Sequence, residues 1–319
     1  MTLQTDLKSP TNKLQAVIEN VEHVIYGKRE AIRNCVVGLL AEGHVLLEDV
    51  PGTGKTTVAR ALAKSIDVGF TRVQFTSDLL PADLLGVAVL AEDRADFVFR
   101  PGPIFGNIVL ADELNRTTPR TQSALLECMA ERRVTAEGET RELPAPFFVI
   151  ATQNPLEFEG TYPLPESQLD RFLLCVRLGY PSRDVERQVL LSRVGLDPLE
   201  AIGAVMTRDE LLAEIEAVRE VRVDEALLDY VLDVVEATRD RGRFLLGASP
   251  RAGLGWMRAA QAMARIEGRE FCVPDDFKRL AVPVLAHRVV PLPTGGGAGD
   301  MSGGEGAVRA LLDAVAAPE

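Results

Sequence analysis

Residues 48–57 read EDVPGTGKTT, and this stretch decides the fold. The glycine-rich run Gly52–Lys55 follows an apolar, strand-like run and precedes a helical pattern of apolar residues, which is the context that a phosphate-binding loop requires. Glycines let successive backbone N–H groups turn inward around phosphate oxygens, and the N-terminal end of the following helix adds its positive dipole end. The sequence therefore predicts a P-loop at the start of a helix.

The residues of this loop are expected to contact different parts of a bound nucleotide and its metal ion. Lys55 is expected to reach the β- and γ-phosphates, and the Thr56 hydroxyl to bind Mg²⁺. Asp49 stands where the pattern usually has its first glycine, outside the positions that form the phosphate cradle. The alternative is a glycine-rich turn beside a surface lysine. The residues predicted to bind nucleotide here are Pro51, Gly52, Thr53, Gly54, Lys55, Thr56 and Thr57.

Two acids follow a second apolar strand. The run Ile108–Ala111 leads directly into Asp112 and Glu113, about 58 residues after Lys55. Carboxylates at the carboxyl end of a parallel strand, beside a phosphate loop, suit metal and water handling. Asp112 is expected to hold Mg²⁺ through water, and Glu113 to orient and polarise an attacking water. A strand that ends in Asp-Glu is a weak signal alone; its place after the loop makes it strong.

A third apolar strand, Phe147–Thr152, ends in Gln153-Asn154-Pro155. A polar amide at the tip of a strand next to the P-loop can hold the attacking water or contact the γ-phosphate. The alternative is an ordinary Asn-Pro turn. The two preceding motifs favour the functional interpretation of Asn154.

The first 180 residues alternate short apolar runs with helical patterns, which predicts an α/β layer of helices around a mostly parallel sheet. Continuous apolar runs suit strands that are covered on both faces. The strands expected are His44–Glu48, Thr71–Phe75, Ile108–Ala111, Phe147–Thr152 and Leu173–Leu178.

The spacing of apolar residues becomes helical after Tyr180-Pro181, from the expected N-cap Ser182 to about Ala286. We therefore expect an α/β domain over residues 1–180 and an all-helical domain over 181–319.

Some segments stand outside these patterns. Residues 86–105 and 132–143 predict two hairpins surplus to the sheet, the second turning at Glu137-Gly138. Surface loops of this kind more often contact a partner than fill a core. The Gly-rich stretch Pro291–Gly304 is expected to be a flexible connection, followed by one short helix over Glu305–Val315.

Composition limits the class of protein. The 319 residues carry a formal net charge of −12, which argues against a protein that mainly neutralises nucleic-acid phosphates. The four cysteines and three histidines are scattered, without metal-binding spacing, so the cysteines and His44 are expected to be core residues. The absence of a signal-peptide pattern and of a long uncharged apolar stretch predicts a cytoplasmic protein.

The motifs, in their order, resemble those of the MoxR family of AAA+ ATPases. The resemblance rests on ADELNRTTPRTQSALLECMAE (111–131), ATQNPLEFEGTYPLPESQLDRF (151–172) and GASPRAGLGWMRAAQAMA (247–264), and covers roughly residues 15–290. It implies a P-loop NTPase with an αβα sandwich, a parallel central sheet and an all-α lid domain. In that family residues 86–105 correspond to an insert in helix 2, and residues 132–143 to a hairpin before the sensor 1 strand.

The resemblance also implies roles for single residues. Asn154 corresponds to sensor 1, Arg171 to an arginine finger that reaches the nucleotide of a neighbouring subunit, and Arg251 to the sensor 2 arginine of the lid. Arg116 is a second candidate to face phosphate in trans. For Arg171 the alternative is a surface cation paired with a nearby acid. Ser249 and Pro250 suit the N-cap and first turn of a helix, where a cation such as Arg251 is unfavourable unless it serves an anion.

The segment VIYG resembles the lining of an adenine pocket, with a hydrophobic staple as the alternative. It comprises Val24, Ile25, Tyr26 and Gly27.

The resulting expectation is a Mg²⁺-dependent ATPase that assembles into a ring, expected to be a hexamer, and remodels a client protein. The family implies a possible partner with a von Willebrand factor A domain. Two other classes stay open. A nucleic-acid motor is favoured by the resemblance to relatives that carry the same hairpins and move along DNA, and by the arginines of hairpin 132–143; the net charge opposes it. A non-hydrolysing nucleotide switch is opposed by the intact pair Asp112 and Glu113.

Overall fold

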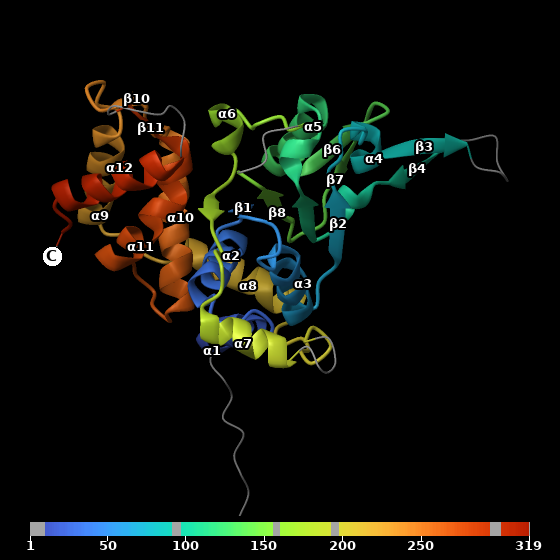
Figure 1. Ribbon diagram of the computed structural model, residues 1–319, viewed down its shortest axis with the longest axis horizontal. Coiled ribbons are helices and arrows are strands. Elements are labelled where there is room, and N and C mark those ends of the chain that lie inside the picture. The colour runs from blue at the N-terminus through green and yellow to red at the C-terminus, as the bar shows by residue number, and fades with distance from the viewer. Residues whose placement is uncertain (1–9, 91–96, 156–159, 193–197, 294–300, 319) are drawn as a thin grey trace, which may run out of the picture.

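The computed structural model describes residues 10–90, 97–155, 160–192, 198–293 and 301–318. Its centre is a five-stranded, all-parallel sheet in the order β2-β5-β8-β1-β9 (Figure 1), which confirms the predicted α/β class. Each expected strand is present within one or two residues of its predicted ends. The strands are β1 (Val45–Glu48), β2 (Phe70–Gln74), β5 (Ile108–Asp112), β8 (Phe148–Gln153) and β9 (Leu174–Val176).

Both faces of this sheet are covered, because successive residues of a strand point to opposite faces. Val45 and Leu47 of β1 pack into one buried cluster with the helices α1 (Pro10–Glu22), α2 (Arg29–Leu40) and α3 (Lys55–Ile66). Leu46 between them packs into a second cluster on the other face. That face is covered by α4 (Pro81–Leu85), α5 (Pro119–Glu131) and the short 3-10 turns η1 (Pro103–Phe105) and η2 (Leu114–Arg116). The αβα sandwich is confirmed.

The two surplus segments form antiparallel hairpins. β3 (Gly86–Leu90) pairs with β4 (Phe97–Pro101), and their tip lies outside the described residues. β6 (Arg133–Ala136) pairs with β7 (Glu139–Glu142) through a turn in which Glu137 and Gly138 both have positive φ. The β3–β4 hairpin projects from the core on the side opposite helices α9–α12 (Figure 1). Arg141 stacks over the ring of Phe99, so the two hairpins contact each other.

The second half of the chain is helical, with one difference from expectation. After the short α6 (Glu166–Leu169) come α7 (Arg183–Ser192), α8 (Arg208–Arg219), α9 (Glu225–Ala237), α10 (Pro250–Ile266), α11 (Pro274–Leu285), η3 (Ala286–Arg288) and α12 (Met301–Ala314). The sequence pattern missed a small antiparallel sheet of β10 (Phe244–Leu246) and β11 (Val290–Pro291). We call the helices α9–α12 with this sheet the lid.

The expectation of a flexible connection through Gly304 is wrong at both of its ends. Pro291 pairs in β11, and α12 begins at Met301 rather than Glu305; residues 294–300 between them lie outside the described part. The glycine reflects close packing instead of flexibility. A Cβ on Gly304 would lie 2.4 Å from the carbonyl oxygen of Ala286, so only glycine lets α12 approach the end of α11 this closely.

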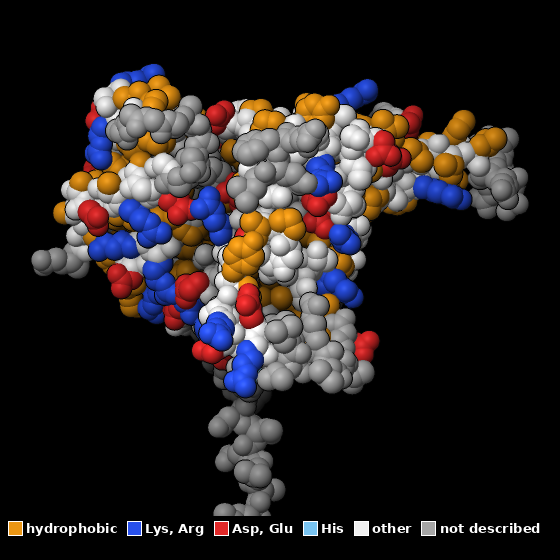
Figure 2. All heavy atoms as spheres, viewed as in Figure 1, with side chains coloured by type: hydrophobic (Ala, Val, Ile, Leu, Met, Phe, Trp, Pro, Cys, Tyr) orange, Lys and Arg blue, Asp and Glu red, His pale blue; other side chains and the backbone are white. Residues whose placement is uncertain are grey.

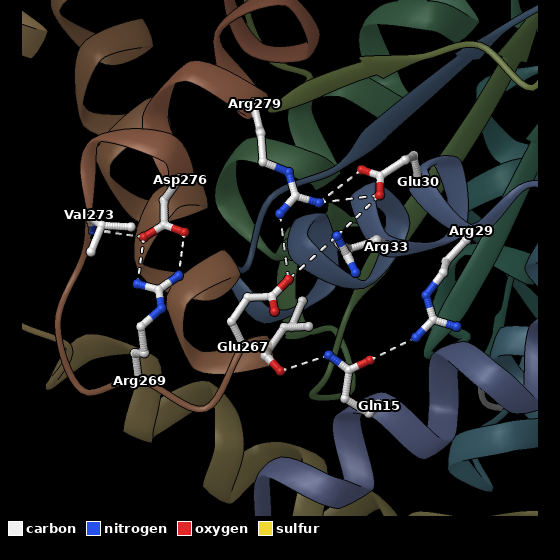
Figure 3. Close-up of polar contacts among 10 residues, drawn as sticks. Gln15, Arg29, Glu30, Arg33, Glu267, Arg269, Val273, Asp276 and Arg279 are labelled. Carbon is white, nitrogen blue, oxygen red and sulfur yellow. Dashed lines mark hydrogen bonds and ion pairs between the residues drawn. The ribbon is translucent and has the colours of Figure 1, made fainter. Parts of the chain in front are cut away.

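A charged network joins the lid to the sandwich (Figure 3). Arg279 of α11 donates to both carboxylate oxygens of Glu30 on α2, at 3.2 Å each. Arg33 of α2 lies 3.1 Å from Glu30 and 3.4 Å from Glu267, the residue that follows α10. Within the lid, Trp256 is fully buried between Tyr230 and Phe277 and donates its indole N–H to the Phe277 carbonyl.

The expectation that His44 and the cysteines are core residues is confirmed except for Cys175, which is only partly buried. His44 is buried; one ring nitrogen faces the Met129 carbonyl at 3.0 Å and the other accepts from a backbone N–H of β8. Three of the four cysteines are buried, and burial raises the pKa of Cys35, Cys128 and Cys272 to about 12. These thiols are therefore not nucleophiles near neutral pH.

Candidate nucleotide-binding site

The loop between β1 and α3 has the geometry of a phosphate cradle. Gly52 and Gly54 both have positive φ, +85° and +93°, a conformation that L side chains adopt only with strain. Gly54 is the N-cap of α3, which aims the free N–H groups of the first helical turn at the loop. The Lys55 ammonium lies inside the loop and donates to the carbonyl oxygens of Asp49 (2.6 Å) and Val50 (3.3 Å).

Asp49, at the position of the usual first glycine, uses its side chain to hold the start of the loop. One carboxylate oxygen accepts from the Val50 N–H at 2.9 Å, and the other accepts from the Gly179 N–H at 2.5 Å. The side chain is 8% exposed, so these bonds are shielded from water. Asp49 thus ties the start of the loop to the segment after β9, and the phosphate cradle begins after it.

The acids at the end of β5 are held by one threonine of the neighbouring strand. Thr152 of β8 is fully buried, and its hydroxyl donates to an oxygen of Asp112 at 2.7 Å. The same hydroxyl accepts from the backbone N–H of Glu113 at 2.8 Å. Glu113 has φ +58°, an uncommon conformation for a non-glycine residue, and the Thr152 bond secures it.

Two side chains of β2 complete this arrangement. Arg72 donates to one oxygen of Asp112 through Nε (3.0 Å) and Nη2 (2.7 Å), and also to the Gln74 side chain. Gln74 in turn donates to a carboxylate oxygen of Glu113 at 2.6 Å. Together with Thr152, these residues were not predicted as part of the site. The sequence pattern that could have identified Arg72 and Gln74 is their alternation with Val73 in a short strand, which places both side chains on the same face of that strand.

The predicted sensor and adenine segments lie next to the loop. Asn154 follows β8 directly, and β8 lies between β5 and β1, so Asn154 stands at the edge of the sheet where the P-loop and the acids are. Asn115 contacts its carbonyl oxygen at 3.5 Å. The Ile25 side chain would lie 3.3 Å from a Cβ on Gly54, which brings the Val24–Gly27 segment against the P-loop.

The predicted arginines occupy different places. Arg171 donates to the carbonyl of Leu126 on α5 at 2.8 Å. Arg251 is exposed in the first turn of α10, where Ser249 is the N-cap and Pro250 follows, as predicted. The Arg116 guanidinium lies 3.2 Å from a carboxylate oxygen of Glu113 in the same chain. The structure of one chain thus brings Lys55 and the acids together and does not bring Arg171 to them.

The residues present fit ATP and Mg²⁺. Burial lowers the pKa of Lys55, while the negative charges of Asp49, Asp112 and Glu113 raise it, so these groups are within electrostatic reach of one another. A carboxylate accepts about four hydrogen bonds, and the three that Asp112 receives leave room for a metal-bound water. In the described part of the chain no cluster of three His, Cys, Asp or Glu side chains could hold a metal alone.

A parallel sheet in this strand order, with a P-loop after β1, acids after β5, a polar amide after β8 and a helical lid, defines a AAA+ protein. Residues 44–174 match the model of the ATPase family associated with various cellular activities, and residues 236–302 match that of the AAA lid domain. With the relatives described below, these matches show that the chain belongs to the MoxR family of AAA+ ATPases.

The relatives match along most of their length. An uncharacterised protein, YeaC, of Bacillus subtilis is 46% identical over 100% of this chain and 98% of its own. The chaperone MoxR1 of Mycobacterium tuberculosis is 42% identical, covering 89% of this chain and 77% of its own. The crystal structure of a protein from Cytophaga hutchinsonii, assigned as an ATPase, superposes with a TM-score of 0.89 at 36% identity, over 97% of this chain and 96% of that one.

Proposed function

We propose that this protein hydrolyses ATP with Mg²⁺ in a ring of subunits and uses the energy to remodel a client protein. The observation that carries the proposal is the cluster of Lys55, Asp112 and Glu113 at the ends of β1 and β5, with Asp112 and Glu113 joined by Thr152. These are a phosphate ligand, a metal-binding acid and an acid that can orient water, within electrostatic reach of one another.

Each residue has one task in this proposal. The backbone N–H groups of Gly52–Thr56 and the Lys55 ammonium bind the phosphates, while the Thr56 hydroxyl and Asp112 hold Mg²⁺. Mg²⁺ bound there would neutralise charge that develops on the phosphate oxygens. Glu113 orients and polarises the attacking water. Gln74 donates to one oxygen of the Glu113 carboxylate, and because a carboxylate accepts about four hydrogen bonds, the same group keeps room to accept from the water.

The site is completed by a second subunit. We assign Arg171 as the finger that contacts the γ-phosphate bound to the neighbour, because an always-charged planar guanidinium suits transferring phosphoryl oxygens. Arg251 reports the nucleotide to the lid, and Asn154 holds the water from the sensor 1 position. A ring, for which six subunits is the expected number, follows from this head-to-tail arrangement.

The client contact is assigned to the projecting β3–β4 hairpin. Figure 2 shows hydrophobic side chains along this projection, and Phe97 is 73% exposed. Exposed apolar side chains of this kind mark contact sites for other proteins. A partner with a von Willebrand factor A domain and a cytoplasmic location remain expectations from the sequence; in the described part of the chain no helix is long and apolar enough to span a membrane.

The test is the rate of Mg-ATP hydrolysis per subunit over a wide range of protein concentration. A rate that rises with concentration supports a site completed in trans. The variant Glu113→Gln should bind nucleotide and fail to hydrolyse it, and hydrolysis at the unmutated rate by this variant would falsify the catalytic assignment. Absence of turnover at every concentration would favour the non-hydrolysing switch.

The alternative of a nucleic-acid motor is weakened by local charge. The arginines of hairpin 132–143 each lie beside an acid of the same chain: Arg132 beside Glu42, Arg133 beside Glu131 and Arg141 beside Glu139. These carboxylates offset the local positive potential that attracts nucleic-acid phosphates. Stimulation of the ATPase by single-stranded DNA, steeply dependent on salt, is the result that would restore this alternative.

A further inference from the structure

The lid contacts Asp170, the residue next to the proposed arginine finger. Asp170 precedes Arg171 in the chain, and its carboxylate meets two lid side chains. The Arg288 Nε of η3 lies 3.0 Å from one oxygen, and the Ser249 hydroxyl, at the start of α10, donates to the other at 3.1 Å. These contacts cross from the lid to the segment between α6 and β9.

Arg288 also holds the backbone on both sides of Arg171. One guanidinium nitrogen donates to the carbonyl oxygens of Asp170 (3.2 Å) and Phe172 (2.7 Å), and another donates to Val284 within the lid (2.9 Å). Arg288 is 5% exposed, so it is a buried cation with nearly every contact in this one segment. A buried charge paired in this way fixes geometry, because moving it away leaves the charge without partners.

We infer that Asp170, Ser249 and Arg288 form a lid clamp that positions Arg171, so that the lid of one subunit sets the finger which that subunit presents to its neighbour. Asp170, Ser249 and Arg288 are positioning residues in this scheme. The inference rests on the proposed function and deepens it, because it names the lid residues that hold the finger in place.

The clamp is adjacent to the predicted sensor. Ser249 is the N-cap of α10, accepting from the Ala252 N–H at 3.2 Å, and Arg251 lies in the same turn. Burial and the charge of Arg251, opposed by the carboxylate of Asp170, lower the pKa of Arg288 to about 10, so the two guanidinium groups repel each other. An anion bound at Arg251 relieves that repulsion and strengthens the hold of Arg288 on Asp170.

Two substitutions of Ser249 distinguish its contact with Asp170 from its role as the N-cap of α10. Aspartate and asparagine cap helices about as well as serine. In Ser249→Asp the new carboxylate faces that of Asp170 and opens the clamp by like-charge repulsion. In Ser249→Asn the amide can still donate to Asp170. We expect Ser249→Asp to lose most of its ATPase activity and Ser249→Asn to keep it, with both variants folded at the assay temperature by circular dichroism.

The decisive experiment mixes subunits. Ser249→Asp subunits keep their own catalytic acid and offer a displaced finger, while Glu113→Gln subunits lack the acid and offer an intact finger. In equimolar mixed rings we expect about one quarter of the wild-type rate per subunit, because half of the subunits keep the acid and half of those meet an intact finger. Arg171→Ala mixed with Glu113→Gln is the positive control. Arg279→Gln, which breaks the lid network of Figure 3 away from Asp170, is the matched lid control and should hydrolyse ATP without mixing.

The outcomes are distinct. Recovery in both mixtures supports the clamp. Recovery with Arg171→Ala but not with Ser249→Asp overturns it, because the serine then acts only within its own subunit. Full activity of Ser249→Asp alone also overturns it. No recovery in the Arg171→Ala control refutes the finger in the proposed function, and the clamp with it.

Discussion

Replacing Thr152 by valine removes one hydroxyl group and keeps the branched shape of the side chain. That hydroxyl donates to the Asp112 carboxylate at 2.7 Å and accepts from the Glu113 N–H at 2.8 Å, at a position without solvent exposure. A hydrogen bond to a charged group is worth about 1.5–3 kcal/mol, and an unpaired buried N–H costs about 1–3 kcal/mol. Asp112 keeps its two bonds from Arg72. We therefore expect the free energy of unfolding to fall by an amount near the lower end of the sum of these two costs, about 3 kcal/mol.

The same substitution should slow catalysis more than it weakens binding. Without the Thr152 bond, the Glu113 N–H loses its acceptor and the positive-φ conformation of Glu113 is held less firmly, and a shift of its carboxylate affects the oriented water rather than the bound phosphates. We expect kcat to fall about 10–100-fold, which corresponds to about 1.4–2.7 kcal/mol, with KM nearly unchanged.

Urea titration followed by far-UV circular dichroism measures the first effect, and steady-state ATP hydrolysis measures the second. Thr152→Ser is the matched control, because it keeps the hydroxyl and loses only a methyl group, at a cost of about 1 kcal/mol. The reasoning is refuted if Thr152→Val is within about 0.5 kcal/mol of the wild type and hydrolyses ATP at the same rate.

Three further predictions concern the loop and the buried histidines. Burial lowers the pKa of His44 to about 4 and that of His287 to about 3, against about 6.5 in the unfolded chain. The unfolded state therefore binds more protons below about pH 6.5, and each histidine should remove about 2 kcal/mol of unfolding free energy between pH 7.5 and pH 5. In urea titrations at both pH values, His44→Gln should lose about half of this difference; an unchanged difference would show that His44 does not cause it. Lys55→Met should abolish binding of a fluorescent ATP analogue while the melting temperature of the free protein stays within a few degrees; retained affinity would contradict its role as phosphate ligand. Asp49→Ala leaves two backbone N–H groups without acceptors and should cost about 2–4 kcal/mol in urea, whereas Asp49→Asn, which keeps one carbonyl acceptor, should cost less; equal costs would argue against the hydrogen bonds.

The sheet could be predicted from the sequence because its strands are continuous apolar runs with punctuated ends. Ile108–Asp112 is buried at every position, so burial on both faces leaves a signal in the sequence itself. The lid sheet left no such signal. β11 is two residues long, and its pairing with β10 depends on how the lid folds around it. The glycines of α12 misled the prediction, because close approach to Ala286 and flexibility demand the same residue.

In the candidate site, the residues to which we assign nucleotide binding and catalysis could be predicted, and the residues that hold them in place could not. Lys55 and Glu113 stand in motifs whose spacing along the chain is local. Arg72 and Thr152 act through neighbouring strands, and their roles depend on the register that sets Gln74 opposite Asp112. That register arises from the packing of the whole sheet and is not written in any short run of sequence.

The chain contains one tryptophan, and its place gives the molecule an internal optical probe. Trp256 is fully buried in the lid, with its N–H bonded to Phe277, so its fluorescence reports on lid packing and on no other part of the protein. Circular dichroism, in contrast, reports on the whole chain. If the two signals change together during unfolding, the lid and the sandwich unfold as one cooperative unit; if the fluorescence changes first, the lid can open while the sheet stays intact.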